Sequence, residues 1–354
     1  MKRLITSFLS LFLLLSLQAQ DRPKVALVLG GGGAKGAAAV GVLKYVEESG
    51  VPIDMIVGTS IGSIVGGLYS IGYTSAQLDS MFRSQEWLNL LTDRSKPSGG
   101  ELLVNEDTMT YVMGFPVRVD LGALKDKLNE KNQKDKDGKK KKLFNFGVFK
   151  GDSIVSTLER MIGFNDSIVF DSLPIPYRCV AVDVNTFSQV VLSSGNLAQS
   201  MRASMAIPFA FRPVQMDGMT LVDGGMLNNL PVDVAKQMGA DIVIAIDLTV
   251  NKRLDKTGET ADTDEFTGED NLLGTFFQKF NLLSVAAWSL LRPDVKIYQR
   301  NLQQVDVYIN PNLKGYGPQD FSAQKVSDMI YLGEKAGKSA FKDLKMLKKK
   351  LHEY

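Results

Sequence analysis

The chain has 354 residues and a net charge of +2, with 44% hydrophobic and 23% charged residues. These proportions are those of a folded globular protein and exclude a predominantly disordered chain. The nearly balanced charge gives no support to nucleic-acid binding, so we expect no nucleic-acid partner.

Residues 1–20 have the pattern of a secretory signal peptide. Two basic residues precede an apolar stretch over 4–17, and the small residue Ala19 lies near the expected cleavage point. A membrane anchor is the alternative, but polar residues interrupt the stretch, which is short for a membrane span. We therefore expect export to the periplasm, to the outer membrane or into the medium.

Two strand–helix units are predicted directly after this leader. Residues 25–29 form an unbroken apolar run, which is typical of a parallel strand covered on both faces. The glycine-rich segment 30–36 leads into a helix that ends near Gly50. A second strand at 53–57 is followed by Gly58-Thr59-Ser60-Ile61-Gly62 and another helix. Two such units predict an α/β sheet.

Ser60 lies between Gly58 and Gly62 at the junction of this second strand and its helix. This is the pattern of a nucleophile elbow, in which a sharp turn requires glycines and leaves the serine hydroxyl exposed. The only histidine is His352, near the C-terminus, so we do not expect a serine, histidine and aspartate triad. The base would be a carboxylate or a lysine. The residues alone leave four aspartates open: Asp54, Asp183, Asp223 and Asp247.

The glycine-rich segment 30–36 offers donors for an oxyanion. Glycines let backbone N–H groups approach a reacting centre, and the helix that follows adds positive partial charge. Lys35 could add a further charge or point into solvent. The segment also satisfies the dinucleotide fingerprint GxGxxG, but that reading needs an acidic residue at the end of the second strand. This chain has Gly58-Thr59-Ser60 there, so we expect no nucleotide.

Further strands and a C-terminal helix are predicted downstream. The expected strands are 177–184, 190–192, 220–222, 241–248 and 305–309, and the helix runs from Phe321 toward Leu347. We expect the only cysteine, Cys179, to lie in the core. Asp223-Gly224-Gly225 taken alone indicates a β-turn. The pattern favours one α/β domain whose last strand and helices come from the C-terminal third.

Two segments differ from the rest in composition, namely a lysine-rich insertion near 125–150 and an acidic loop over 255–271. Lys125–Lys142 indicates either a solvated loop or a contact with anionic lipid, where each basic residue contributes about 1 kcal/mol near a charged bilayer. The apolar residues within Phe276–Leu283 indicate either ordinary core or a membrane-facing or lid helix.

Three separated motifs resemble, in order, those of the patatin-like phospholipases. They are the GGGxKG loop at Gly31–Gly36, the elbow at Gly58–Gly62 and Asp223-Gly224-Gly225. Ala203–Pro208 is similar to the family's central block. The resemblance covers about 25–236 and implies a three-layer α/β/α fold with a mostly parallel central sheet and a nucleophile elbow. Residues 237–354 would complete the α/β domain.

The resemblance implies a bacterial, exported lipid acyl hydrolase of the phospholipase A type that works with a serine and aspartate dyad. Ser60 would be the nucleophile and Asp223 the base. The other implied site residues are Gly31, Gly32, Gly33, Lys35 and Gly36 in the oxyanion hole, Gly58 and Gly62 in the elbow, and Gly224 and Gly225 in the aspartate motif. This chemistry needs no metal and no organic cofactor.

The substrate implied by the resemblance is a membrane phospholipid or another acyl lipid. Two alternatives stay open, a general serine esterase or acyltransferase and a catalytically silent lipid-binding module. Because the dyad needs no histidine, removing the tail from Lys348 onward, and His352 with it, is expected to leave activity largely intact.

Overall fold

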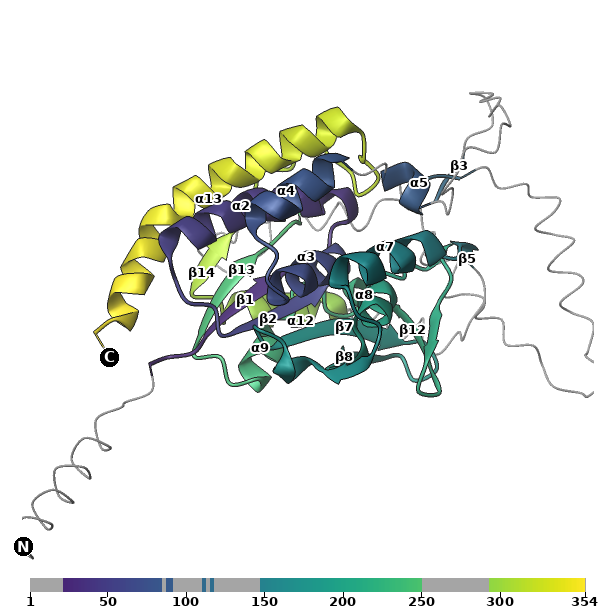
Figure 1. The fold of residues 1–354 in the computed structure, drawn as a ribbon, viewed down its shortest axis with the longest axis horizontal. Helices are drawn as coiled ribbons and strands as arrows, with labels where there is room; N and C mark the ends of the chain where they lie inside the picture. The colour runs from purple at the N-terminus through teal and green to yellow at the C-terminus, as the bar shows by residue number, and fades with distance from the viewer. Residues whose placement is uncertain are drawn as a thin grey trace, which may run out of the picture.

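The computed structural model describes residues 22–84, 87–91, 110–112, 115–117, 147–249 and 293–353 (Figure 1). The expected signal peptide, the segment Lys125–Lys142, the acidic loop and Phe276–Leu283 lie outside these ranges. The described helices are α2 (Gly36–Ser49), α3 (Ile61–Ser70), α4 (Ser75–Ser84), α5 (Trp87–Leu91), α7 (Asp152–Ile162), α8 (Leu197–Ser204), α9 (Val232–Gln237), α12 (Pro293–Leu302) and α13 (Ala323–Leu351).

The described strands are β1 (Val25–Leu29), β2 (Met55–Thr59), β3 (Thr110–Val112), β4 (Phe115–Val117), β5 (Gly147–Phe149), β6 (Ser167–Val169), β7 (Tyr177–Asp183), β8 (Ser188–Leu192), β9 (Ser194–Asn196), β10 (Phe209–Phe211), β11 (Val214–Met216), β12 (Met219–Asp223), β13 (Ile242–Ile246) and β14 (Val307–Ile309). Eight of them form the central sheet, in the order β11-β12-β7-β2-β1-β13-β14, with β8 also paired to β7. From β7 to β14 the neighbours are parallel, whereas β8, β11 and β12 add antiparallel pairs.

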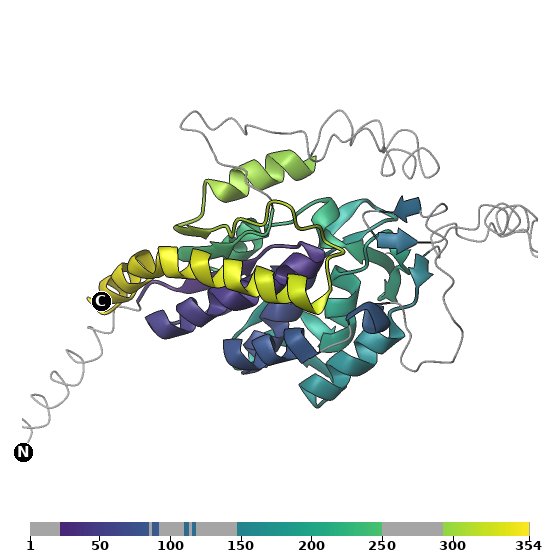
Figure 2. The ribbon, with the colours of Figure 1, turned by 90° about the horizontal axis from the view of Figure 1, so that it is seen from above.

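Both faces of the sheet are covered by helices, which explains the unbroken apolar run of β1. Leu27 and Leu29 pack into one hydrophobic cluster with residues of α2, α3 and α13. Ala26 and Val28, which point to the opposite face, pack into a second cluster with residues of α9 and α12. Figure 2 shows α12 on the opposite side of the molecule from α2 and α4. The fold is therefore the expected three-layer α/β/α arrangement.

The element boundaries differ from the predicted ones by a few residues. β2 begins and ends two residues later than 53–57, because Gly58 and Thr59 still pair with Cys179 and Val180 of β7. β14 is shorter than 305–309, since Val305 is in a turn in which its N–H donates to Leu302. α13 continues beyond the predicted Leu347 to Leu351. Cys179 is fully buried, as expected.

The last helix, α13, lies along α2 with their backbones in close approach (Figures 1 and 2). A Cβ added at Gly41 would lie 2.1 Å from the carbonyl oxygen of Ile330, and one at Gly333 would lie 2.0 Å from that of Ala38. The two helices run in the same direction, so the end of α13 lies beside Gly50 and the start of α2 lies beside Pro318. Within the described ranges, no helix has the length and apolar character needed to cross a membrane.

Candidate active site

The sheet register brings Ser60 and Asp223 together. β2 and β12 pair with the same strand, β7, one after the other along its length. Thr59, the last residue of β2, pairs with Val180, and Asp223, the last residue of β12, pairs with Ala181. Because β12 runs antiparallel to β7 and β2 runs parallel to it, the two strands end facing each other. Ser60, which follows β2, and Asp223, which ends β12, therefore meet although 163 positions separate them in the sequence.

The backbone at Ser60 forms the strained turn expected of an elbow. Ser60 has φ 55° and ψ −127°, a conformation that non-glycine residues rarely adopt. The flanking glycines are required by close packing of backbone. A Cβ at Gly58 would lie 2.4 Å from the carbonyl oxygen of Gly62, and one at Gly62 would lie 2.4 Å from that of Leu29. No larger residue fits at either position.

A second serine, Ser204, holds the elbow in place. Its hydroxyl accepts a 3.0 Å hydrogen bond from the N–H of Ser60 and donates a 2.6 Å bond to the carbonyl of Val180. Ser204 is fully buried at the end of α8. It therefore ties the turn that carries Ser60 to the strand on which β2 and β12 meet.

The Asp223 carboxylate lies where it can take the proton of the Ser60 hydroxyl. Oγ of Ser60 donates to Oδ2 at 2.6 Å, and the N–H of Gly225 donates to Oδ1 at 2.7 Å. Asp223 is only 7% exposed. Burial raises the pKa of Asp223 to about 6, although the hydrogen bonds from Ser60 and Gly225 oppose the rise. The carboxylate is thus more basic than an ordinary aspartate and still largely ionised at neutral pH.

The other three candidate aspartates are engaged elsewhere. Asp54 forms an ion pair with Arg22 at 2.7 Å. Asp183 accepts hydrogen bonds from Asn185, Thr186 and the N–H of Thr220. Asp247, fully buried, accepts from the hydroxyls of Tyr298, Tyr308 and Thr249. Only Asp223 of the four hydrogen-bonds Ser60.

The glycine loop adjoins Ser60, and two of its N–H groups are unused. A Cβ at Gly31 would lie 3.0 Å from the Cβ of Ser60. The amides of three predicted members of the hole donate to carbonyls of the protein: Gly31 to Asn229, Lys35 to Gly32 and Gly36 to Gly33. In the described part of the chain, the N–H groups of Gly32 and Gly33 have no acceptor. These two are therefore available to a ligand, and Lys35 is half-buried beside them.

Residues from the C-terminal third and from the segment after Asp223 hold this loop. The carbonyl of Pro318 accepts a 2.8 Å hydrogen bond from Ala34. Asn229 bonds Gly31 twice, since its carbonyl accepts from the Gly31 N–H at 3.1 Å and its side chain donates to the Gly31 carbonyl at 3.3 Å. Gly33 has φ 58° and leaves no room for a Cβ, which would lie 2.4 Å from the Pro318 oxygen.

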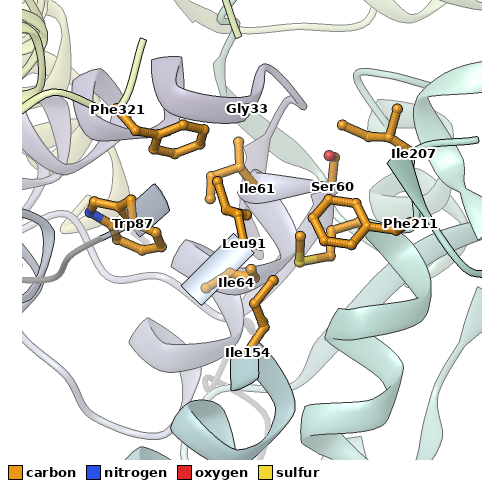
Figure 3. Close-up of a pocket in the computed structure, with 11 residues that line it drawn as sticks. Gly33, Ser60, Ile61, Ile64, Trp87, Leu91, Ile154, Ile207, Phe211 and Phe321 are labelled. Carbon is orange, nitrogen blue, oxygen red and sulfur yellow. The ribbon is translucent and has the colours of Figure 1, made fainter. Parts of the chain in front are cut away.

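An apolar pocket opens beside Ser60 (Figure 3). Its free space is about 30 Å³. Apart from Ser60 and Gly33, its lining is hydrophobic: Ile61, Ile64, Trp87, Leu91, Ile154, Met205, Ile207, Phe211 and Phe321. The side chains come from α3, α5, α7, the α8–β10 region and the segment that precedes α13. Such a lining favours a hydrocarbon group next to the serine hydroxyl.

Sequence reasoning did not single out several residues of this site. Ser204 belongs to the block Ala203–Pro208 that resembles the family's, and no pattern in the sequence indicates its bond with the elbow. Pro318 and Phe321 come from the C-terminal third of the chain and Trp87 from beyond α4, and no local signal connects them to Ser60. Asn229 follows the aspartate motif by a few residues, and that proximity was the one available hint.

Comparison with known proteins places this site in context. Residues 27–236 match the model of a family described as patatin-like phospholipase. Patatin-like phospholipase domain-containing protein 6 of Homo sapiens is 30% identical over 334 residues, covering 90% of this chain and 20% of that protein. Lysophospholipase nte1 of Aspergillus fumigatus is 29% identical over 336 residues, covering 91% of this chain and 18% of that protein. This chain spans about a fifth of the length of these relatives.

Among solved structures, VipD from Legionella pneumophila aligns with a TM-score of 0.46 at 16% identity, over 91% of this chain and 67% of that one.

Proposed function

This chain belongs to the patatin-like phospholipase family, and on that basis we propose that it is a lipid acyl hydrolase of the phospholipase A type that cleaves carboxylic esters. The observation that carries the proposal is the hydrogen bond of 2.6 Å between Ser60 Oγ and Asp223 Oδ2, beside an apolar pocket. A strained serine, a buried carboxylate and unused amides supply the nucleophile, base and oxyanion donors that acyl transfer requires. The substrate is a membrane phospholipid or another acyl lipid.

In the proposed first step, Asp223 takes the proton of Ser60 while Oγ attacks the ester carbonyl. The carbonyl oxygen becomes an oxyanion that the N–H groups of Gly32 and Gly33 receive. One such donor contributes about 3 to 4 kcal/mol of transition-state stabilisation. The ester C–O bond then breaks, the proton on Asp223 passes to the departing alcohol, and the acyl group remains on Ser60.

In the second step, water takes the place of the departed alcohol. Asp223 accepts a proton from the water, the resulting hydroxide attacks the acyl carbonyl, and the same two amides receive the second oxyanion. Collapse releases the fatty acid, and the proton returns from Asp223 to Ser60 Oγ. One carboxylate with a pKa of about 6 serves both steps, because it alternates between base and acid.

The experiment is mass spectrometry of phospholipid vesicles incubated with the protein, beside Ser60→Ala and Asp223→Asn. We expect free fatty acid and lysophospholipid with the wild type and neither product with Ser60→Ala. Product formation by Ser60→Ala at the wild-type rate would refute the assignment of the nucleophile. Transfer of the acyl group to an added alcohol in preference to water would favour an acyltransferase. No turnover of lipids or of soluble esters would favour a silent lipid-binding module.

Export is part of the proposal and rests on the leader-like residues 1–20. The enzyme would act in the bacterial periplasm, at the outer membrane or outside the cell, and Lys125–Lys142 would contact anionic lipid. Cell fractionation with N-terminal sequencing tests the first point, and a full-length protein that stays in the cytoplasm would contradict it. Vesicle binding that does not change with the content of anionic lipid would contradict the second.

A further inference from the structure

The pocket beside Ser60 has one polar end and an otherwise hydrocarbon wall. Among the described residues that line it, Ser60 alone supplies a side-chain oxygen. If Ser60 attacks an ester, the part of the substrate inside the pocket is hydrocarbon, because buried polar groups would find no partner there. The departing alcohol and any head group then lie outside. This reasoning rests on the proposed function and assigns the pocket to the acyl chain.

Two stacked aromatic rings line the pocket on the side away from Ser60. Trp87 and Phe321 have ring centroids 5.8 Å apart with planes inclined by 30°. Figure 3 shows both rings across the pocket from Ser60. Trp87 is anchored, since its Nε1 donates a 2.9 Å hydrogen bond to the carbonyl of Phe82 and its ring also packs on the Phe82 ring.

Phe321 is the less constrained of the two rings. It is half-buried and directly precedes Ser322, the residue that caps α13. It also lies outside the residues that match the family model, which end at 236. Phe321 lines the pocket directly, across it from Ser60. An acyl chain that extends from Ser60 through the pocket toward Trp87 therefore meets this ring.

We infer that the pocket is the acyl-chain subsite and that Phe321, stacked on Trp87, sets the length of acyl chain that the enzyme accepts. The ring acts as the end wall of the subsite. Removing it extends the subsite toward Trp87 without altering Ser60, Asp223 or the glycine loop. Selectivity among substrates thus depends on a residue contributed by the C-terminal third of the chain.

The test is kcat/KM for monomeric p-nitrophenyl esters with acyl chains of increasing length, from butyrate to laurate. Wild type is compared with Phe321→Ala and the milder Phe321→Leu. The matched control is Phe341→Ala, because Phe341 is also half-buried and also pairs with an aromatic ring, Tyr45, at 5.8 Å between centroids. Phe341 lies on α13 against α2 and does not line the pocket.

We expect Phe321→Ala to move the optimum to longer chains and to raise the laurate-to-butyrate ratio of kcat/KM by about 15-fold. This corresponds to two more buried methylenes at roughly fourfold each. Phe321→Leu should give a smaller shift and Phe341→Ala none. If Phe321→Ala does not fold, as judged by circular dichroism, Phe321→Leu carries the test.

Two results would overturn the inference in distinguishable ways. A wild type that cleaves these esters through Ser60, with the same length profile in both Phe321 variants, would leave the proposed function standing and refute the role of Phe321. A wild type that cleaves no ester of any length, and no lipid, would remove the proposed function and this inference with it.

Discussion

Asp223 and Ser60 form a hydrogen bond of 2.6 Å because two strands end face to face on a third. The contact therefore depends on sheet register, which cannot slip by one residue without turning every side chain to the other face. This makes the pair a rigid unit in which the carboxylate is already oriented by the N–H of Gly225. Little reorganisation is needed before proton transfer.

Asp223→Asn is expected to lower kcat by about 10²- to 10⁴-fold, the usual contribution of a general base. In the wild type, kcat/KM should be constant above pH 6 and fall tenfold per pH unit below it, since the base must be ionised and its pKa is about 6. A pH–rate profile on a soluble ester checks this. A profile that remains flat down to pH 4 would contradict Asp223 as the base.

Asp223→Asn should also make the protein more stable at alkaline pH. Ionised Asp223 is costly in the folded state, because its folded pKa of about 6 exceeds the value of about 4 for an unfolded aspartate. The cost is absent below pH 4 and grows as the pH rises to 6 and above, to about 2 to 3 kcal/mol. In urea denaturation, the free energy of unfolding of Asp223→Asn should exceed that of the wild type by more at pH 8 than at pH 5. Equal differences at both pH values would argue against a raised pKa.

Ser204→Ala is expected to reduce both stability and turnover. It leaves the N–H of Ser60 and the carbonyl of Val180 without their partner in a buried site, which costs about 1 to 3 kcal/mol. Ser204→Thr retains the hydroxyl and should recover part of kcat. Ser200→Ala is the control, because Ser200 lies buried in the same helix and its hydroxyl makes no hydrogen bond to a described residue. Equal losses in the Ser200 and Ser204 alanine variants would refute a specific role for Ser204.

Gly33→Ala is expected to lower kcat by about 10²- to 10³-fold, the effect of losing one oxyanion donor. The added Cβ would meet the carbonyl of Pro318 and displace the loop. Gly72→Ala has the same kind of backbone strain, with φ 106°, but its Cβ would contact nothing within 4 Å. The control should lose stability and keep its turnover number. Comparable losses of kcat in both variants would mean that strain, and not the loop position, is responsible.

His352→Ala should leave kcat unchanged, because His352 is exposed at the end of α13 while the site lies at the other end of α2. The fourteen residues of α2 separate those ends by about 20 Å. Cutting the chain at Lys348 is a poorer test than it appears from the sequence, since it also removes Leu351, which is buried. Steady-state kinetics of the point variant are sufficient, and loss of activity in a folded protein would reopen the question of a triad.

The helices and strands that are marked by neighbouring residues in the chain were predictable from the sequence. The apolar runs and glycines around Val25–Leu29 and Ser60 define two strand–helix units through residues close together in the chain. Strand ends were less accurate, because β2 extends through Gly58 and Thr59 only on account of pairing with β7. That pairing is a property of the folded sheet.

The choice of Asp223 shows the same limit for the active site. Four aspartates near strand ends were equivalent in the sequence until a resemblance to a family separated them. The structure distinguishes them by which strands share an edge of β7 and by which carboxylates already have partners, such as Asp54 with Arg22. The pocket was not predictable either, since Trp87 and Phe321 approach each other from opposite thirds of the chain.

The close contact of α2 with α13 means that a match to a family model does not mark where this protein can be cut. A fragment of residues 27–236 would lack β13, the strand next to β1, and would expose an open sheet edge of the kind that promotes aggregation. It would also expose the face of α2 at Gly41 and remove the Pro318 carbonyl that accepts a hydrogen bond from Ala34. Any shortened version made for crystallisation or engineering has to retain the sequence through Leu351.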